Sequence, residues 1–350
     1  MSASRTAPSE DMRAAHLTGP MQLEVRQIPT PQPPPGGALL KVRSIGLCGS
    51  DINRIRHTTS GETRVLGHEV VGEIVSIDNT DVDFRPGERL AVGHVHVPCM
   101  HCVYCRHGAP AMCRHFKNIR IQPGGYAEYI ALTPDHLAHS VLRLPDRVSD
   151  GAATFIDPLA CCLRALDLGR VQAFDRVVVV GAGIMGLLFV QLLRELRAEN
   201  FVIDISSHRL DVAKQFGAQH TTGSSGAGLA DEILSRTDGQ GADLVLFTYL
   251  NQQILTDALA YARDGSRLCV FAPPIESLDL HIDFFEFFRR EMRMYSSYSS
   301  SMQDLETALQ WIASGRVDVE AMITGRTDLE GMLKTVEELD DTQLKVIVEP

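Results

Sequence analysis

The stretch DRVVVVGAGIMG, residues 175–186, places a G-x-G-x-x-G pattern directly after a run of four valines. A helix-length apolar segment follows, and NFVID at 200–204 has the composition of a second strand. A strand, a glycine turn and a helix in this order are typical of a dinucleotide-binding unit, in which the helix N-terminus receives the pyrophosphate. The residues predicted to contact the dinucleotide are Gly181, Gly183, Ile184, Met185 and Gly186.

A carboxylate at the end of the second strand bears on the choice of dinucleotide. Asp204 lies 18 residues after Gly186. A carboxylate here accepts hydrogen bonds from a ribose 2′-hydroxyl and repels a 2′-phosphate, so Asp204 favours NAD over NADP. Arg209 favours the opposite choice, because a nearby arginine accommodates that phosphate. The alternative is a plain strand–turn–helix whose Asp204 faces solvent.

The pattern around this motif changes character near residue 150. Beyond that point strand-like runs such as DLVLFTY (243–249) and SRLCVFAP (266–273) alternate with helical ones. This alternation predicts an α/β fold with a doubly wound parallel sheet. Before that point, ALLKVRSIGL (38–47) and VVGEIVSI (70–77) are short and separated by Gly and Pro, which predicts a mostly antiparallel β domain.

The composition excludes several classes of protein. The chain has 350 residues, 44% of them hydrophobic and 22% charged, with a formal net charge of −11, which argues against a nucleic-acid partner. Its apolar runs are too short to span a bilayer, so no membrane association is expected. The N-terminal residues lack an apolar segment of the kind found in secretory signals, and eight cysteines in so large a chain favour metal or core roles. We therefore expect a cytoplasmic protein.

Four cysteines in PCMHCVYCRHGAPAMC form a compact cluster with the spacing C-x2-C-x2-C-x7-C. Four thiolates this close can surround zinc as a tetrahedron with no open position, which is typical of a structural site. An iron–sulfur cluster is the alternative, although no proline follows the last cysteine. His101, His107 and His115 are expected to be exposed loop residues. The predicted zinc ligands are Cys99, Cys102, Cys105 and Cys113.

A second metal site is suggested by residues scattered along the chain. GLCGSD offers Cys48, LGHEVVG offers His68 and Glu69, and FIDPLACC offers Asp157. A cysteine, a histidine and a carboxylate can hold a catalytic zinc with one position left for water or substrate. The spacing alone leaves other readings open: Cys48 in the core, His68 in a loop, and Asp157 as a helix cap.

The order of these motifs resembles that of the zinc-dependent medium-chain dehydrogenase/reductase superfamily, and most of all its polyol branch with sorbitol and threonine dehydrogenases. The motifs, in order, are GLCGSD, GHEVVGEIVSID, the four cysteines, GGYAEY, DPLA and GAGIMG. The resemblance runs from about residue 13 to the C-terminus. It implies a GroES-like, mostly β catalytic domain at 12–153 and 301–350, and a Rossmann domain at 154–300.

The resemblance also implies roles for particular residues. Cys48 and His68 match zinc ligands, and Glu69 matches a glutamate that binds the metal directly or lies near it. Asp157 matches a glutamate that binds zinc or its water. Ser50 matches a hydroxyl that accepts the substrate proton, and Asp51 a partner of the ligand histidine.

Three positions depart from the family pattern. Asn53 stands where other zinc alcohol dehydrogenases place a proton-relay histidine, so that relay is expected to be absent. Asp157 is one methylene shorter than the usual glutamate, which makes Cys161, on the same helical face, an alternative ligand. Ser299 and Ser300 align with an Arg-Tyr pair that binds polyol hydroxyls in sorbitol dehydrogenases. Without that cation an amino sugar or aminocyclitol becomes an acceptable substrate, unless the serines are surface loop.

The combined prediction is an oxidoreductase with one catalytic and one structural zinc. It moves a hydride between a secondary hydroxyl of a polyol, cyclitol or (amino)sugar and NAD, and the family implies a homodimer or homotetramer. The rival predictions are an NADPH-dependent carbonyl reductase of the same fold and a non-catalytic dinucleotide-binding protein.

Overall fold

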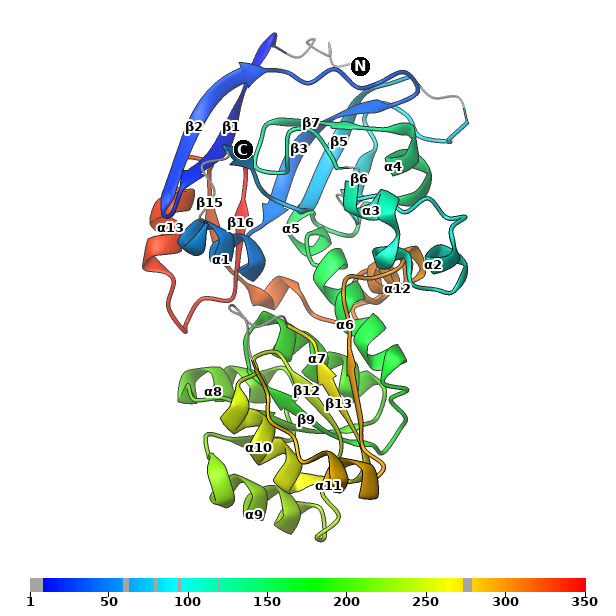
Figure 1. Ribbon diagram of the computed structural model, residues 1–350. Helices are drawn as coiled ribbons and strands as arrows, with labels where there is room; N and C mark the ends of the chain where they lie inside the picture. The colour runs from blue at the N-terminus through cyan, green and yellow to red at the C-terminus, as the bar shows by residue number, and fades with distance from the viewer. Residues whose placement is uncertain (1–8, 59–62, 79–80, 94–95, 119, 273–278) are drawn as a thin grey trace. The chain divides into compact units, whose positions relative to one another are not determined.

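The computed structural model describes residues 9–58, 63–78, 81–93, 96–118, 120–272 and 279–350 (Figure 1). The chain divides into two compact units. The first unit comprises Met1–Asp157, Ser301–Ala313 and Val319–Pro350, and the second comprises Pro158–Ser300 and Ser314–Asp318. Among the described residues, no helix is both long and apolar enough to cross a membrane.

The units divide at 300/301, as expected, but their first division lies at 157/158 and not at the expected 153/154. Phe155 is fully buried and lies under the ammonium group of Lys345 at 5.3 Å, which keeps this segment in the first unit. Ser314–Asp318 joins the second unit. There the side chain of Gln191 exchanges two hydrogen bonds, of 2.7 and 3.2 Å, with the backbone of Asp318.

The first unit contains two sheets in its described part. A three-stranded sheet has the order β2-β1-β4, and a seven-stranded sheet has the order β15-β16-β3-β5-β6-β8, with β7 paired to β3. Most pairs are antiparallel, as predicted, and β15 with β16 is parallel. The strands are β1 (Asp11–Gly19), β2 (Gln22–Pro29), β3 (Ala38–Gly46), β4 (Arg64–Val65), β5 (Glu69–Ile77), β6 (Arg89–Val92), β7 (Tyr129–Leu132), β8 (Val141–Arg143), β15 (Ile323–Thr327) and β16 (Lys345–Val348).

The C-terminal strand β16 returns to the first unit beside β3, as the red and blue strands of Figure 1 show. Its apolar residues Val346 and Val348 enter the same core cluster as Val42 and Val70. Short helices and turns connect the strands. They are α1 (Gly49–His57), α2 (Val103–Arg106), η1 (Pro110–Met112), α3 (Arg114–Asn118), α4 (Pro134–His139), α5 (Asp150–Ala153), α12 (Met302–Ala313), η2 (Glu320–Met322) and α13 (Met332–Glu338).

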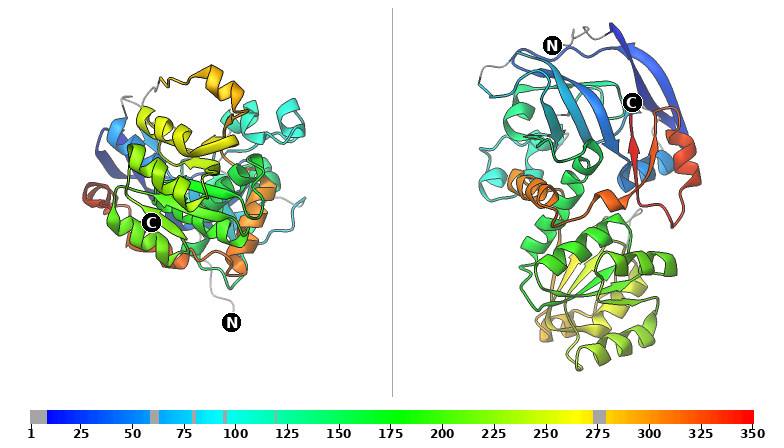
Figure 2. Two further views of the ribbon diagram at one scale, coloured as in Figure 1. Left: turned by 90° about the horizontal axis from the view of Figure 1, so that it is seen from below. Right: turned by 180° about the vertical axis from the view of Figure 1, so that it is seen from behind.

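The second unit confirms the predicted doubly wound parallel sheet. Its six strands have the order β11-β10-β9-β12-β13-β14, all parallel, and Figure 2 shows helices on both faces. The valines of β9 are buried because this strand lies inside the sheet. The strands are β9 (Arg176–Val180), β10 (Glu199–Ile203), β11 (His220–Thr222), β12 (Ala242–Phe247), β13 (Ala262–Val270) and β14 (Arg293–Ser296). The helices are α6 (Ile156–Leu168), which begins in the first unit, α7 (Ile184–Glu195), α8 (Ser207–Gln215), α9 (Gly226–Arg236), α10 (Gln252–Tyr261) and α11 (Phe284–Arg289).

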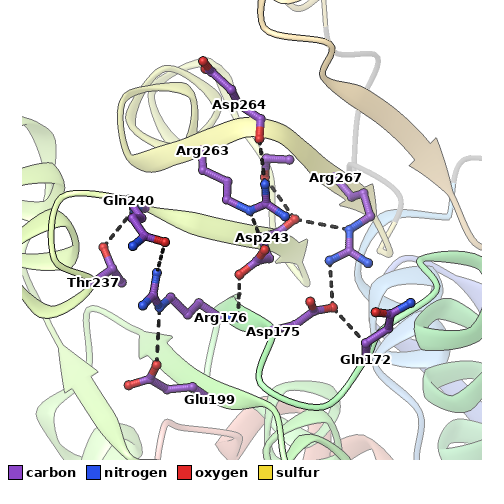
Figure 3. A network of polar contacts seen from close by, with 12 residues as sticks. Gln172, Asp175, Arg176, Glu199, Thr237, Gln240, Asp243, Arg263, Asp264 and Arg267 are labelled. Carbon is purple, nitrogen blue, oxygen red and sulfur yellow. Dashed lines mark hydrogen bonds and ion pairs between the residues drawn. The ribbon is translucent and has the colours of Figure 1, made fainter.

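A network of charged side chains ties together the amino ends of these parallel strands (Figure 3). Asp243 on β12 accepts a hydrogen bond of 2.9 Å from the backbone N–H of Arg176 on β9, and it also pairs with Arg263 on β13. Arg267 pairs with Asp175 at 2.8 Å. The network lies at the end of the sheet opposite the glycine loop, because that loop follows the carboxyl end of β9. It therefore stabilises the sheet without taking part in the dinucleotide site.

Candidate active site

Cys48, His68 and Glu69 are brought together in the first unit. Their candidate ligand atoms all lie within 4.8 Å of one another. Cys48 is the N-cap of α1, two residues after the end of β3, while His68 precedes β5 and Glu69 begins it. The antiparallel register pairs Gly46 with Glu69, so the end of one strand and the start of the other meet at this point.

Gly46 is required for this close approach. A Cβ atom built on Gly46 would lie 1.9 Å from Oε2 of Glu69, far inside van der Waals contact. Any side chain at position 46 would therefore displace the Glu69 carboxylate. Gly46 contributes to the site because the absence of a side chain leaves room for the Glu69 carboxylate.

Asp51 lies behind His68. It is 2% exposed, and its Oδ2 atom lies 3.2 Å from Nδ1 of His68. Burial alone raises the pKa of Asp51, but the charge and hydrogen bond of His68 and the hydrogen bond of Tyr126 outweigh it and lower that pKa. Burial lowers the pKa of His68, but Asp51 and Cys48 outweigh it and raise that pKa well above its ordinary value. The arrangement presents the Nε2 atom of His68 as the free ligand nitrogen.

The charge partner of Glu69 is Lys345, a residue that the sequence analysis did not identify. Nζ of Lys345 lies 2.5 Å from Oε2 of Glu69, and each side chain is 1% exposed. The two residues are 276 positions apart and meet because β16 pairs with β3 beside β5. Lysine is rarely buried unless it is paired, so a lysine at the head of the apolar segment KVIV was the available signal.

Asp157 lies in the first turn of α6 and is half-buried. Burial raises its pKa to about 7; the nearby charges of His68 and Lys345 oppose this rise, and that of Glu69 adds to it. It therefore belongs to the same electrostatic environment. Among the described residues, however, neither Asp157 nor Cys161 joins the group whose ligand atoms lie within 4.8 Å of one another.

Ser50 and Asn53 lie on α1, next to Cys48. The Oγ atom of Ser50 is 3.4 Å from Sγ of Cys48 and donates a hydrogen bond to it. Ser50 is exposed, so its hydroxyl is accessible from solvent, whereas Asn53 is half-buried one turn further along the helix. The position of Ser50 suits a hydroxyl that exchanges a proton beside the candidate metal site.

The four cysteines form the second ligand group, again within 4.8 Å of one another. The Sγ atoms of Cys102 and Cys105 are 3.6 Å apart, as are those of Cys99 and Cys113. Sulfurs around tetrahedral zinc are separated by about 3.8 Å, so this geometry fits zinc closely. Burial raises the pKa of Cys113, but backbone N–H groups, first that of Cys99, outweigh it and lower that pKa to about 6.

The histidines near these cysteines are exposed, as predicted, but His115 lies on α3 and not in a loop. Nδ1 of His101 lies 2.6 Å from the carbonyl oxygen of Cys99, and Nδ1 of His107 lies 2.7 Å from that of Val103. His115 is 47% exposed at its side chain. None of the three belongs to the ligand group found among the described residues.

Both ligand groups fit zinc by donor chemistry. Four thiols with tetrahedral spacing match a closed structural site, and Cys, His and a carboxylate match an open catalytic one. Beside the group of Cys48, His68 and Glu69 lies an ammonium, that of Lys345, which would share the Glu69 carboxylate with a bound cation.

The glycine loop of the second unit has the features expected for a pyrophosphate. Gly181 has a φ of +98°, and a Cβ on Gly186 would lie 1.9 Å from the carbonyl oxygen of Gly181. Gly183 is the N-cap of α7, without a side-chain hydrogen bond, and a Cβ there would meet nothing within 4 Å. The first N–H groups of α7, from Ile184 and Met185 onward, are thus open to an anion.

Asp204 already has partners within the protein. Its Oδ2 atom accepts from the N–H of Ala182 at 2.7 Å, and its Oδ1 atom accepts from the N–H of Ser206 at 2.8 Å. Each carboxylate oxygen keeps a second lone pair for a ribose hydroxyl. The bond to Ala182 places this carboxylate directly against the glycine loop, while Arg209 lies one turn into α8.

The serines aligned with the polyol-binding pair are not a simple surface loop. Ser300 is fully buried, and Ser299 is half-buried with a φ of +59°. The reading of both as surface residues is therefore wrong for Ser300.

Two family models match the chain. The alcohol dehydrogenase GroES-like domain matches residues 34–146, and the zinc-binding dehydrogenase domain matches residues 185–314. Together they span more than half of the sequence. The mostly antiparallel first unit and the parallel sheet of the second therefore define a GroES-like domain joined to a Rossmann domain.

Similar proteins cover nearly the whole chain. Sorbitol dehydrogenase of Bacillus subtilis is 27% identical over 97% of this chain and 98% of its own length. An alcohol dehydrogenase from Escherichia coli CFT073, solved with NADH, has a TM-score of 0.86 at 26% identity and covers 98% of this chain and 100% of its own. A zinc-binding dehydrogenase from Sinorhizobium meliloti 1021, solved with NADP, has a TM-score of 0.84 at 26% identity with the same coverage.

The chain belongs to the zinc-dependent medium-chain dehydrogenase/reductase superfamily, in its polyol dehydrogenase-like branch. It is an oxidoreductase of this type.

Proposed function

We propose that this oxidoreductase uses zinc and NAD to oxidise a secondary hydroxyl of a polyol, cyclitol or (amino)sugar, or to reduce the corresponding ketone. The observation that carries the proposal is the convergence of Cys48, His68 and Glu69, with Asp51 hydrogen-bonded behind His68. A fold that merely bound dinucleotides would not need this buried and charged arrangement. The relationship to a sorbitol dehydrogenase supports the substrate class.

Each group of site residues has its own proposed role. Cys48 and His68 would hold the catalytic zinc, with Glu69 and Asp157 beside it, and the four cysteines would hold the structural zinc. When bound, zinc supplies polarisation of a hydroxyl group, and the nicotinamide ring supplies a hydride acceptor. The glycine loop and Asp204 would bind the dinucleotide.

Ser50 is the group that accepts the substrate proton in this proposal. Its hydroxyl borders Cys48 and is exposed, so it can pass the proton to solvent. Asn53, on the next turn of α1, has no titratable group and cannot relay that proton. The proton therefore leaves Ser50 by a route that does not use position 53.

The absence of the Arg-Tyr pair that binds polyol hydroxyls affects which substrates the enzyme is expected to accept. Ser299 and Ser300 provide no cation, so a positively charged substrate meets no repulsion from these positions. We propose aminated sugars and cyclitols as substrates beside simple polyols. The experiment is NAD reduction by the zinc-loaded enzyme across polyols, cyclitols and their amino derivatives. Turnover of simple polyols without any turnover of aminated substrates would overturn the aminated part of the proposal.

Zinc content tests the metal part of the proposal separately. Two ions per chain are expected, one at each ligand group. A single ion, retained when Cys48 is replaced by serine, would place metal only at the four cysteines. That result would favour a non-catalytic dinucleotide-binding protein.

Replacing Asp204 with asparagine is expected to shift the cofactor preference. Asparagine keeps an acceptor for the N–H of Ala182 or Ser206 but removes the charge that repels a 2′-phosphate. Hydrogen bonds to charged groups contribute about 1.5–3 kcal/mol, so we expect the NAD-over-NADP ratio of kcat/KM to fall about tenfold or more. Steady-state kinetics with both cofactors measure it. A wild-type enzyme that prefers NADP would support the NADPH-dependent reductase instead.

The assembly and location of the protein stay predictions. A homodimer or homotetramer is expected from the family, and light scattering after size-exclusion chromatography measures it. The cytoplasmic location likewise stays a prediction.

A further inference from the structure

Tyr126 contacts the acceptor atom on which His68 depends. Its hydroxyl donates a hydrogen bond of 2.9 Å to Oδ2 of Asp51. The same Oδ2 atom lies 3.2 Å from Nδ1 of His68. One buried oxygen therefore receives both donors, and Tyr126 is 75 residues away from Asp51 in the sequence.

The position of Tyr126 is set by its backbone as well as by its hydroxyl. Its N–H donates to the carbonyl oxygen of Leu66 at 3.0 Å, and its own carbonyl oxygen accepts from Ala15 at 2.9 Å. A Cβ on Gly67, the residue before His68, would lie 2.8 Å from the backbone nitrogen of Tyr126. The segment that carries His68 thus packs directly on the backbone of Tyr126.

Because both groups are buried, the Tyr126 hydroxyl constrains the position of the Asp51 carboxylate. Tyr126 is 1% exposed and Asp51 2% exposed, so water has little access to either polar group. In such an environment an unpaired hydroxyl or carboxylate is costly, and the two groups hold each other in one geometry. Burial, followed by the charge of Asp51, raises the pKa of Tyr126 well above its ordinary value, so the hydroxyl stays protonated as the donor.

We propose that Tyr126 is a positioning residue, whose hydroxyl fixes the Asp51 carboxylate so that His68 keeps its Nδ1 atom engaged and presents Nε2 to the catalytic metal. This inference rests on the proposed zinc site. Tyr126 touches neither substrate nor cofactor in this role, and it acts through Asp51. Its hydroxyl also makes a longer contact, of 3.5 Å, with the carbonyl oxygen of Gly46. A phenylalanine at this position would pack equally well but would leave Oδ2 of Asp51 with one donor fewer.

The test is the Tyr126→Phe variant of the zinc-loaded chain, with zinc release into a colorimetric chelator as the readout. Loss of an outer partner of a metal-ligand histidine weakens metal binding by about 10–100-fold, so we expect the release phase from the Cys48 site to accelerate by that factor. The release phase from the four cysteines should not change. In the cobalt-exchanged chain, the absorption bands of the cobalt beside His68 are expected to shift.

Tyr261→Phe is the matched control. Tyr261 is also 1% exposed, but it lies on α10 in the second unit. The Tyr261→Phe substitution removes an equally buried hydroxyl that does not contact Asp51, so zinc release should be unchanged. Equal acceleration in both variants would reveal a general loss of stability and would overturn the proposal.

A double-mutant cycle with Asp51→Ala isolates the link between the two residues. If Tyr126 acts through Asp51, adding Tyr126→Phe to Asp51→Ala changes zinc release by less than about twofold. Full acceleration in that background would overturn the inference. Wild-type chains that bind zinc only at the four cysteines would overturn both the proposed function and this inference. Two bound ions with unchanged release in Tyr126→Phe would overturn the inference alone.

Discussion

In the metal-free chain, the Lys345→Met substitution is expected to lower the free energy of unfolding by about 3–5 kcal/mol relative to the wild-type chain. The reason is that the substitution leaves the Glu69 carboxylate buried without its partner. Nζ of Lys345 and Oε2 of Glu69 are 2.5 Å apart, with 1% of each side chain exposed. Methionine retains most of the apolar stem of lysine, so the loss reflects the charge rather than a cavity.

Fluorescence of the single tryptophan measures this loss. Trp311 lies on α12 in the first unit, so its signal follows the unit that contains the pair. The matched variant is Lys345→Met combined with Glu69→Gln, which removes both charges. We expect it to recover most of the lost stability, since an unpaired charge is no longer buried. Equal destabilisation of the single and double variants would show that packing, not charge, dominates at Lys345.

Zinc should reduce the cost of removing Lys345. A cation near Cys48 and His68 provides Glu69 with another positive partner, so the loss in stability is expected to be smaller in the zinc-loaded chain. The comparison uses the same tryptophan signal with and without metal. A loss that is identical in both states would indicate that Glu69 does not interact with the bound metal.

The Cys48→Ser variant is expected to lose about a thousandfold or more in kcat/KM and one of two zinc ions per chain. Polarisation of a substrate oxygen by a metal lowers a barrier by several kcal/mol, and each 1.36 kcal/mol corresponds to a factor of about ten. Serine is a poorer zinc ligand than a thiolate, while the small size of the side chain is preserved. Metal analysis and steady-state kinetics measure the two losses.

Cys161→Ser is the control for this substitution. Cys161 is half-buried on α6 and, among the described residues, lies outside both ligand groups. We expect full zinc content and nearly unchanged activity. If Cys161→Ser instead loses zinc while Cys48→Ser retains it, the assignment of Cys48 as a ligand is wrong.

The sequence alone was sufficient for the features whose residues lie close together in the chain. The glycine loop is six residues long, and the four-cysteine cluster spans Cys99–Cys113, so local geometry already determines which atoms meet. The alternation of strands and helices beyond residue 150 likewise predicted the parallel sheet, because each element contains its own hydrophobic period. The family pattern added Cys48, His68 and Glu69 by their order along the chain.

Only the tertiary structure decided which charges surround those residues. Lys345 reaches Glu69 across 276 positions because β16 pairs with β3, and Tyr126 reaches Asp51 across 75. Neither residue belongs to a short motif that predicts its partner, since a buried ion pair or hydrogen bond depends on how distant segments pack together rather than on spacing. The sequence by itself thus determined the class of fold and the ligand types. Strand pairing decided that Glu69 is neutralised by a lysine, and the packing of two distant segments decided that the acceptor behind His68 has a second donor.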